Sequence, residues 1–149
     1  MGFVGLTLLV GAVDGLLTAP AIRTWYLALA RPPGTPPNWL FGPVWTVLYA
    51  MIAVAAWLVW QKPWHRRALL LWGWQLLANA LWTPIFFGLH LIGVALLEVL
   101  VLLLLAGLTT VAFARLSRPA ALLMLPYLAW TCYATYLNAG FWWLSPGWA

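Results

Sequence analysis

Five apolar segments divide the chain: roughly residues 3–21, 39–60, 68–88, 91–114 and 120–143. Each approaches the ~20 residues that an α-helix needs to cross about 30 Å of hydrocarbon. All seven Lys and Arg lie between these segments, whereas the two acids, Asp14 and Glu98, lie within them. Because backbone polar groups in lipid must be satisfied inside each segment, and no alternating barrel pattern is present, we expect helices. Residues 1–149 are predicted to form one all-α membrane domain, a bundle of five transmembrane helices.

The composition excludes an ordinary soluble domain, because 66% of the residues are hydrophobic and only 6% are charged. The net charge of +5 comes from basic residues between the segments, which indicates membrane topology and contact with lipid headgroups rather than nucleic-acid binding. Lys and Arg are more frequent on the side of the N-terminus and of loops two and four. The positive-inside rule therefore predicts a cytoplasmic N-terminus, with the first loop and the C-terminus on the opposite side.

The first apolar segment has no Lys or Arg before it and carries Asp14 within it, so we expect a retained helix and not a signal peptide. Gly11 and Gly15 have the small-residue spacing that lets two helices approach closely. Close packing inside one subunit and a dimer seam both fit this spacing. The single cysteine, Cys132, excludes a disulfide framework.

Residues 22–38 form the only long predicted loop, and it contains four prolines: Pro32, Pro33, Pro36 and Pro37. Prolines at this density forbid a helix and stiffen the backbone. We therefore predict a semi-rigid lid that also carries Trp25 and Tyr26, suited to cover a pocket.

The third apolar segment carries the polar residues Gln75, Asn79 and Thr83 at intervals of four, which places them on one helix face beside Trp82 and Phe86. Amide side chains are costly in hydrocarbon unless they are satisfied, so this stripe should face protein, water or a ligand. An interhelical hydrogen bond and a ligand contact are equally open for Asn79. A further residue, Pro84, is expected to kink this helix near mid-membrane.

Aromatic residues also gather on the second and fifth helices. Trp45 and Tyr49 share a face of the second, and Trp130, Ala134 and Leu137 share a face of the fifth. Trp82 and Trp130 fall near the middle of their helices, where no membrane interface attracts them. For both, the sequence favours pocket lining over core packing.

The acids Asp14 and Glu98 are functional candidates because they lie inside the membrane. Either a proton path or a neutral acid bonded to a neighbouring helix fits them. His65 and His90 lie in short loops far from the aromatic residues, so neither is expected to be an axial haem ligand and no metal site is predicted. No nucleophile, base and orienting acid are grouped as in a hydrolytic enzyme.

Five motifs together resemble the tryptophan-rich sensory protein family, also called translocator protein or peripheral benzodiazepine receptor. They span residues 23 to 138 in the order of that family. The motifs are Arg23-Thr-Trp-Tyr26 and the Pro-Pro lid, Pro43-Val-Trp45-Thr-Val-Leu-Tyr49, Asn79-Ala-Leu-Trp82-Thr-Pro-Ile-Phe-Phe-Gly88, Pro126-Tyr-Leu-Ala-Trp130 and Ala134-Thr-Tyr-Leu-Asn138.

The resemblance implies a five-helix, usually dimeric bundle. Its pocket lies under the first loop and accepts porphyrins, haem-like tetrapyrroles, steroids and benzodiazepine-site ligands. It also implies light-dependent porphyrin breakdown in some members, with no cofactor required. Together with the helix faces above, it predicts twelve ligand-binding residues: Tyr26, Pro36, Pro37, Trp45, Tyr49, Asn79, Trp82, Thr83, Phe86, Trp130, Ala134 and Leu137.

Two departures from the family pattern are visible. The lid reads Arg31-Pro-Pro-Gly34 where the family usually has Lys-Pro and an aromatic residue. No basic residue follows Tyr136-Leu-Asn138, which is similar to bacterial members rather than to cholesterol-binding animal ones. We therefore expect a bacterial-type receptor or carrier of tetrapyrroles, forming a homodimer. The alternative is a small proton-coupled exporter that uses Glu98 or Asp14.

Overall fold

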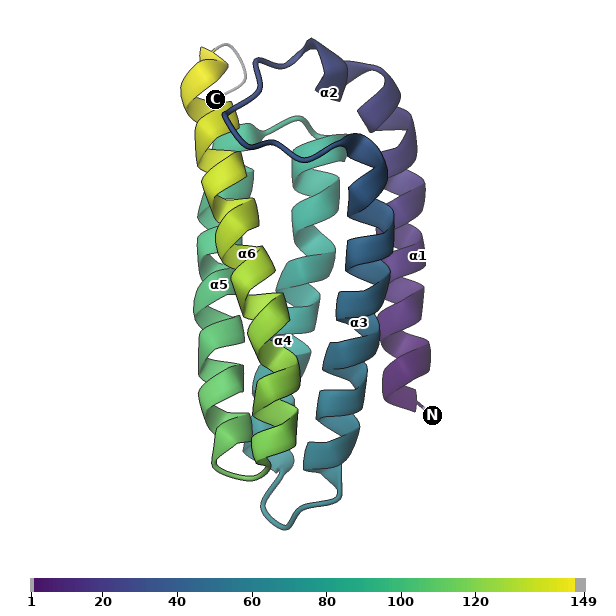
Figure 1. Ribbon diagram of the computed structural model, residues 1–149, viewed down its shortest axis with the longest axis vertical. Coiled ribbons are helices and arrows are strands. Elements are labelled where there is room, and N and C mark those ends of the chain that lie inside the picture. Colours follow the sequence, from purple (N-terminus) through teal and green to yellow (C-terminus); the bar gives the residue numbers. More distant parts are fainter. Residues whose placement is uncertain (1, 147–149) are drawn as a thin grey trace.

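The computed structural model describes residues 2–146, which form an all-helical bundle. Long helices lie roughly side by side, and the N-terminus and the C-terminus lie at opposite ends (Figure 1). The described part contains six α-helices and one π-helical segment, not simply the five predicted helices. These elements are α1 (Gly2–Arg23), α2 (Trp25–Ala28), α3 (Asn38–Trp60), α4 (Arg66–Thr83), η1 (Pro84–Gly88), α5 (Ile92–Ala114) and α6 (Arg118–Leu144).

The sixth helix arises within the predicted loop 22–38. Helix α1 runs to Arg23, the short helix α2 begins at Trp25, and α3 begins at Asn38, so within 22–38 only Thr24 and residues 29–37 lie outside helices. Prolines explain this non-helical stretch, but they begin at Pro32 and leave the preceding residues free to form α2. We call residues 29–37 the lid loop.

Pro84 interrupts the third long segment, as the sequence predicted. Proline has no N–H with which to continue the α-helical pattern. The chain widens into η1, where the N–H of Leu89 donates to the carbonyl of Pro84 over 2.9 Å. This π-helical turn keeps Phe86 and Phe87 at the inner side of the bundle, where their rings contact each other and Trp82.

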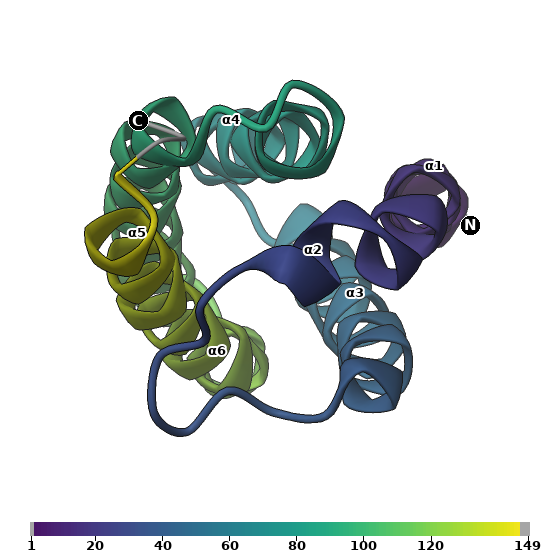
Figure 2. The same ribbon diagram turned by 90° about the horizontal axis from the view of Figure 1, so that it is seen from above.

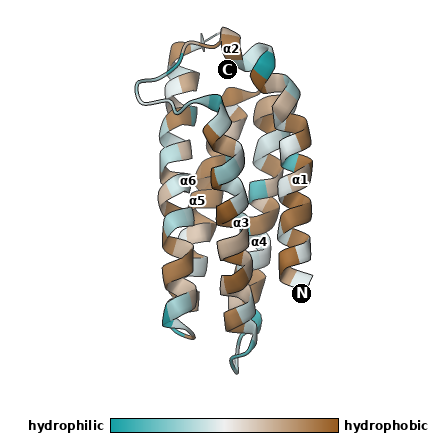
Figure 3. Ribbon diagram, turned by 45° about the vertical axis from the view of Figure 1, so that its right-hand side comes forward, coloured by the Kyte–Doolittle hydropathy of each residue, from teal (hydrophilic) through white to brown (hydrophobic). Residues whose placement is uncertain are grey.

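Four helices are long and apolar enough to cross a membrane by length and composition: α1, α3, α5 and α6. Hydrophobic colours predominate along the helices, and hydrophilic colours mark the loops at both ends and some positions within the helices (Figure 3). Helix α1 is the most exposed of the four, since only Thr7, Asp14 and Ala21 are buried along it. The chain is therefore a multi-pass membrane protein.

The helices are arranged in a ring, seen from the lid end in Figure 2. Helix α1 packs against α3, α3 against α6, α6 against α5, α5 against α4, and α1 again contacts α4 and η1. This order places chain-distant helices around one central space.

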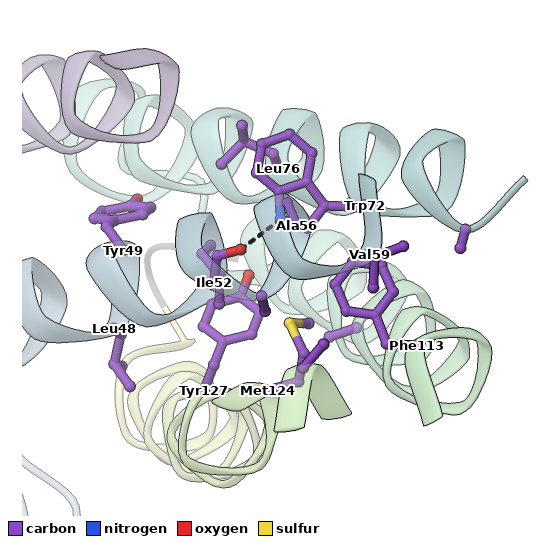
Figure 4. Packing of buried hydrophobic residues seen from close by; sticks show 14 residues of the cluster. Leu48, Tyr49, Ile52, Ala56, Val59, Trp72, Leu76, Phe113, Met124 and Tyr127 are labelled. Atoms are coloured by element: carbon purple, nitrogen blue, oxygen red, sulfur yellow. Dashed lines mark hydrogen bonds between the residues drawn. The ribbon is translucent and has the colours of Figure 1, made fainter. Parts of the chain in front are cut away.

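The half of the ring away from the lid is solidly packed. Ile52, Val59, Trp72, Phe113 and Met124 meet there from four helices (Figure 4). The indole N–H of Trp72 donates to the carbonyl of Ile52 over 3.1 Å, which satisfies its polar atom inside this core. The packed half leaves the space below the lid as the place for a site.

Candidate functional site

A cavity of about 570 Å³ lies between α1, α3, α4 and α6 beneath α2. This volume falls within the ~300–1,000 Å³ typical of small-molecule sites. The structure brings ten of the twelve predicted residues to the lining: Tyr26, Trp45, Tyr49, Asn79, Trp82, Thr83, Phe86, Trp130, Ala134 and Leu137. Pro36 and Pro37 are not among the lining residues, and the residues just after them, Asn38, Trp39 and Phe41, line the cavity instead.

Helix α1 supplies a wall that sequence reasoning missed. Asp14 faces the cavity from α1, together with small residues of the same helix: Gly11, Ala12, Gly15, Thr18 and Ala19. The reason is visible at Gly11, where an added Cβ would lie 2.8 Å from Cδ2 of Tyr49. Gly11 thus lets α1 approach α3 within one subunit. The signal was present in the sequence as a stripe of small residues that includes an acid.

Aromatic rings form two further walls. Trp45 of α3 and Trp130 of α6 meet edge to face, with ring centroids 6.5 Å apart. Across the cavity, Trp82 stacks on Phe86 with centroids 5.0 Å apart and planes only 20° from parallel. These walls present flat apolar faces, which suit a flat ligand.

The floor of the cavity, which we define as Asp14, Tyr49 and Asn79, is polar. The Tyr49 hydroxyl lies 2.8 Å from Oδ2 of Asp14 and 2.6 Å from Oδ1 of Asn79. Behind the floor, Nδ2 of Asn79 donates to the Tyr127 hydroxyl over 2.8 Å, and that hydroxyl donates to Oε1 of Gln75 over 2.6 Å. One row of hydrogen bonds therefore connects α1, α3, α4 and α6. It shows that Asn79 is both an interhelical contact and a lining residue.

The hydroxyl proton of Tyr49 can serve only one of its two oxygen neighbours. Tyr49 has a single hydroxyl proton but lies between two oxygen acceptors, one on Asp14 and one on Asn79. A tyrosine hydroxyl donates once and accepts otherwise. Tyr49 therefore donates to Asp14 or to Asn79, and the orientation of the side-chain amides selects which of the two.

A second polar contact holds Trp82 in place. Its indole N–H donates to Oδ1 of Asn138 over 3.0 Å, and Nδ2 of Asn138 donates to the carbonyl of Ile92 over 2.9 Å. Because Ile92 begins α5, this pair also connects α6 to α5 next to the π-helical turn. The Trp82 ring is thus oriented by its partner and not only by packing.

The lid loop is attached to α6. The hydroxyl of Tyr133 donates to the carbonyl of Gly34, and the hydroxyl of Tyr136 donates to the carbonyl of Pro33 over 2.9 Å. Gly34 has a φ of 81°, a left-handed conformation that glycine adopts without steric cost. Pro32 packs so closely on Gly140 that an added Cβ there would lie 2.5 Å from the proline Cβ.

A positive charge lies near the lid end of the cavity, on Arg31, which contacts a lining residue but does not itself line the cavity. The guanidinium of Arg31 lies over the ring of Tyr26, 5.4 Å from its centroid. Burial raises the pKa of Tyr26 to about 12, so this phenol is neutral at physiological pH. Its hydroxyl is buried without a hydrogen-bond partner among the described residues.

The other ionisable residues singled out from the sequence lie outside the cavity. Glu98 is half-buried on α5, and Cys132 is exposed on α6. The ring of His90 stacks on Trp25 with centroids 4.1 Å apart, and His65 contacts the carbonyl of Lys62. None of these four lines the cavity.

Comparison with known proteins gives a consistent result. Residues 3–144 match the TspO/MBR family. The tryptophan-rich protein TspO of Chlorobaculum tepidum is 38% identical over 139 residues, covering 91% of this chain and 88% of that protein. The human translocator protein is 40% identical over 129 residues, covering 83% and 76% of the two chains. The tryptophan-rich sensory protein of Cereibacter sphaeroides is 40% identical over 127 residues, covering 85% and 79%.

Proposed function

Because the chain belongs to the TspO/MBR family, we propose that it is a membrane receptor or carrier whose cavity binds tetrapyrroles such as protoporphyrin. The observation that carries this proposal is the cavity itself, in which aromatic walls face each other above a polar floor. Sites for small molecules are mostly apolar, with a few placed polar groups that orient the ligand. Relatives named translocator and sensory proteins are consistent with such a role.

The proposal includes five membrane spans, with α4 and η1 together as the span that lies outside the four apolar helices. Arg66–Gly88 contains enough residues to reach across ~30 Å of hydrocarbon. The polar residues that lower its hydropathy, Gln75, Asn79 and Thr83, are buried inside the ring. Its outer face is apolar and exposed at Leu70, Trp74, Leu77 and Leu81. This division between a polar inner face and an apolar outer face supports a span that faces lipid on one side.

The ring of the ligand would lie between the Trp45–Trp130 wall and the Trp82–Phe86 wall. Burial of its flat faces supplies most of the binding free energy, since aromatic contacts combine large apolar area with specific geometry. Carboxylate groups of a porphyrin would lie at the lid end, where Arg31 and the unpartnered hydroxyl of Tyr26 are found. The lid loop, attached to α6, would then cover the bound ligand.

The decisive experiment is a titration of the purified protein with protoporphyrin, followed by tryptophan fluorescence. Trp45→Leu and Trp130→Leu keep apolar volume but remove a ring, so each should weaken binding about two- to tenfold. Trp74→Leu is the matched control, because Trp74 is an exposed tryptophan on the outer face of α4. Equal affinities in all three variants would show that protoporphyrin does not bind in this cavity.

A proton-coupled exporter is the alternative function. The row of hydrogen bonds from Asp14 to Gln75 is a possible proton path, but Glu98 does not line the cavity. An exporter would therefore depend on Asp14 alone for direct contact with its cargo. Because only one of the two intramembrane acids lines the cavity, we prefer a receptor or carrier.

A further inference from the structure

The cavity contains one carboxyl group and no basic side chain among the described residues that line it. Asp14 lies in the middle of α1, is only 8% exposed, and is hydrogen-bonded to the hydroxyl of Tyr49. The Thr83 hydroxyl also interacts with this carboxyl group. An acid inside a membrane without a cation beside it is costly when it is charged. A ligand that brings a positive charge removes that cost.

The row of hydrogen bonds behind the floor can accept either charge of Asp14. In one orientation of the amides, a protonated Asp14 donates to Tyr49, Tyr49 to Asn79, Asn79 to Tyr127, and Tyr127 to Gln75. A half-turn of the two side-chain amides exchanges their donors and acceptors. Gln75 then donates to Tyr127, Tyr127 to Asn79, Asn79 to Tyr49, and Tyr49 to a charged Asp14. Every contact in the row is kept in both directions.

We propose that Asp14 makes the floor a subsite for the positively charged part of a planar aromatic ligand. The proposal deepens the proposed function and rests on the same cavity as the binding site. The aromatic walls support it, because the faces of Trp and Tyr attract cations, and Trp45 lies with Tyr49 at a centroid distance of 5.5 Å. The ligand charge and the Asp14 charge stabilise each other where each alone would be unfavourable.

The subsite orients its ligand. A carboxylate on the same ligand is repelled from the floor by Asp14 and attracted to Arg31 at the lid end. A ring with a cationic edge and an anionic edge therefore enters with the cationic edge first. A ring with carboxylates only gains nothing from the floor and depends on the walls and the lid.

Affinity for a cation should increase as pH rises, because the charged Asp14 is the form that pairs with it. The pH response is simple only if no other group that faces Asp14 changes its charge. Helix α3 presents Tyr49, and α4 presents Asn79 and Thr83, of which only Tyr49 ionises. Helix α6 contributes Tyr127, two hydrogen bonds further along the row. Tyrosine hydroxyls ionise near pH 10, so at lower pH the carboxyl group is the one of these groups that can change charge.

The test compares two rings of nearly the same shape, the permanent cation 10-methylacridinium and the neutral 9-methylanthracene, by quenching of tryptophan fluorescence. In the unaltered protein, the cation should bind more tightly as pH is raised from about 5 to 8, and the neutral ring should not respond. Asp14→Asn mimics the neutral acid and keeps a donor for Tyr49. It should weaken cation binding by on the order of tenfold and leave the neutral ring unaffected.

Glu98→Gln is the matched control, because it removes the other intramembrane acid from outside the cavity. It should leave both rings unaffected. If Asp14→Asn binds the cation as tightly as the unaltered protein does, the subsite is wrong, although protoporphyrin binding still stands. If the cation effect is present but protoporphyrin does not bind, the subsite is supported and the tetrapyrrole proposal fails. If the neutral ring shows that Asp14→Asn is misfolded, the pH titration of the unaltered protein decides, and a flat response overturns the proposal.

Discussion

At the scale of single residues, the site depends on the absence of one side chain. Gly11 leaves room for the ring of Tyr49, and Tyr49 in turn holds the oxygen atoms of Asp14 and Asn79. Gly15, one turn further along α1, also lines the cavity, but an added Cβ there would meet nothing within 4 Å. The two glycines share a helix and a cavity and differ in their contact with α3.

We expect Gly11→Ala to destabilise the protein and Gly15→Ala to leave its stability unchanged or slightly raised. The new methyl group at position 11 forces the Tyr49 ring to move, and such overpacking costs about 1–3 kcal/mol. At position 15 the only direct effect is the better helix propensity of alanine. Unfolding of the purified protein in detergent, followed by circular dichroism, measures both. Equal losses of stability would show that Gly11 does not set the α1–α3 approach.

Among the elements, α6 holds the lid loop in addition to the loop's own prolines. Tyr133 and Tyr136 donate to consecutive lid carbonyls, and Pro32 fits against Gly140. Tyr133 lines the cavity and Tyr136 does not, so Tyr136 can be substituted without changing a lining residue. The lid loop is therefore restrained in two ways, by the stiffness predicted from its prolines and by its attachment to α6, about one hundred residues later in the chain.

Removal of the Tyr136 hydroxyl should speed the exchange of ligand. Tyr136→Phe deletes one hydrogen bond of about 0.5–1 kcal/mol to the lid, which raises the open population roughly two- to fivefold. Stopped-flow fluorescence with protoporphyrin should show faster release. Thr135→Ala, which removes a hydrogen bond within α6 to the carbonyl of Thr131, is the control and should release ligand at the original rate. Unchanged release in Tyr136→Phe would mean that the lid does not limit exit.

At the scale of the whole molecule, the ends of the bundle differ in charge. Loop 61–65, the turn before α6 and the N-terminus lie at one end, and the lid loop and the C-terminal part of α6 lie at the other (Figure 1). Five of the seven basic residues belong to the first end: Lys62, Arg66, Arg67, Arg115 and Arg118. The positive-inside rule therefore predicts that this end faces the cytoplasm.

Single-cysteine labelling tests this orientation. In a Cys132→Ser background, Ala30→Cys places a thiol in the exposed lid loop and Gln61→Cys places one at the opposite end. In intact cells, a membrane-impermeant maleimide should label position 30 and reach position 61 only after the membrane is opened. The reverse pattern would show that the basic loops face outward.

Particular residues show how much of the fold and the site could be predicted from the sequence. Periodicity placed Asn79, Trp82 and Trp130 on inner helix faces, and ten of the twelve predicted residues line one cavity. The path of the lid was not predictable, because it depends on contacts between residues such as Gly34 and Tyr133 that are far apart in the chain. For this reason Trp39 and Phe41, rather than Pro36 and Pro37, reach the cavity.

Hydropathy and the 3.6-residue period are local properties, so they were enough to predict the membrane environment and the inner face of most helices. The folded arrangement of the helices was needed to show that α1 completes the cavity and that Asp14 meets Tyr49, which is 35 residues away. A pattern along one helix states which side chains share a face, but the order of helices in a ring and the rotation of each about its axis follow from side-chain packing between segments. The charge of the cavity floor depends on that packing.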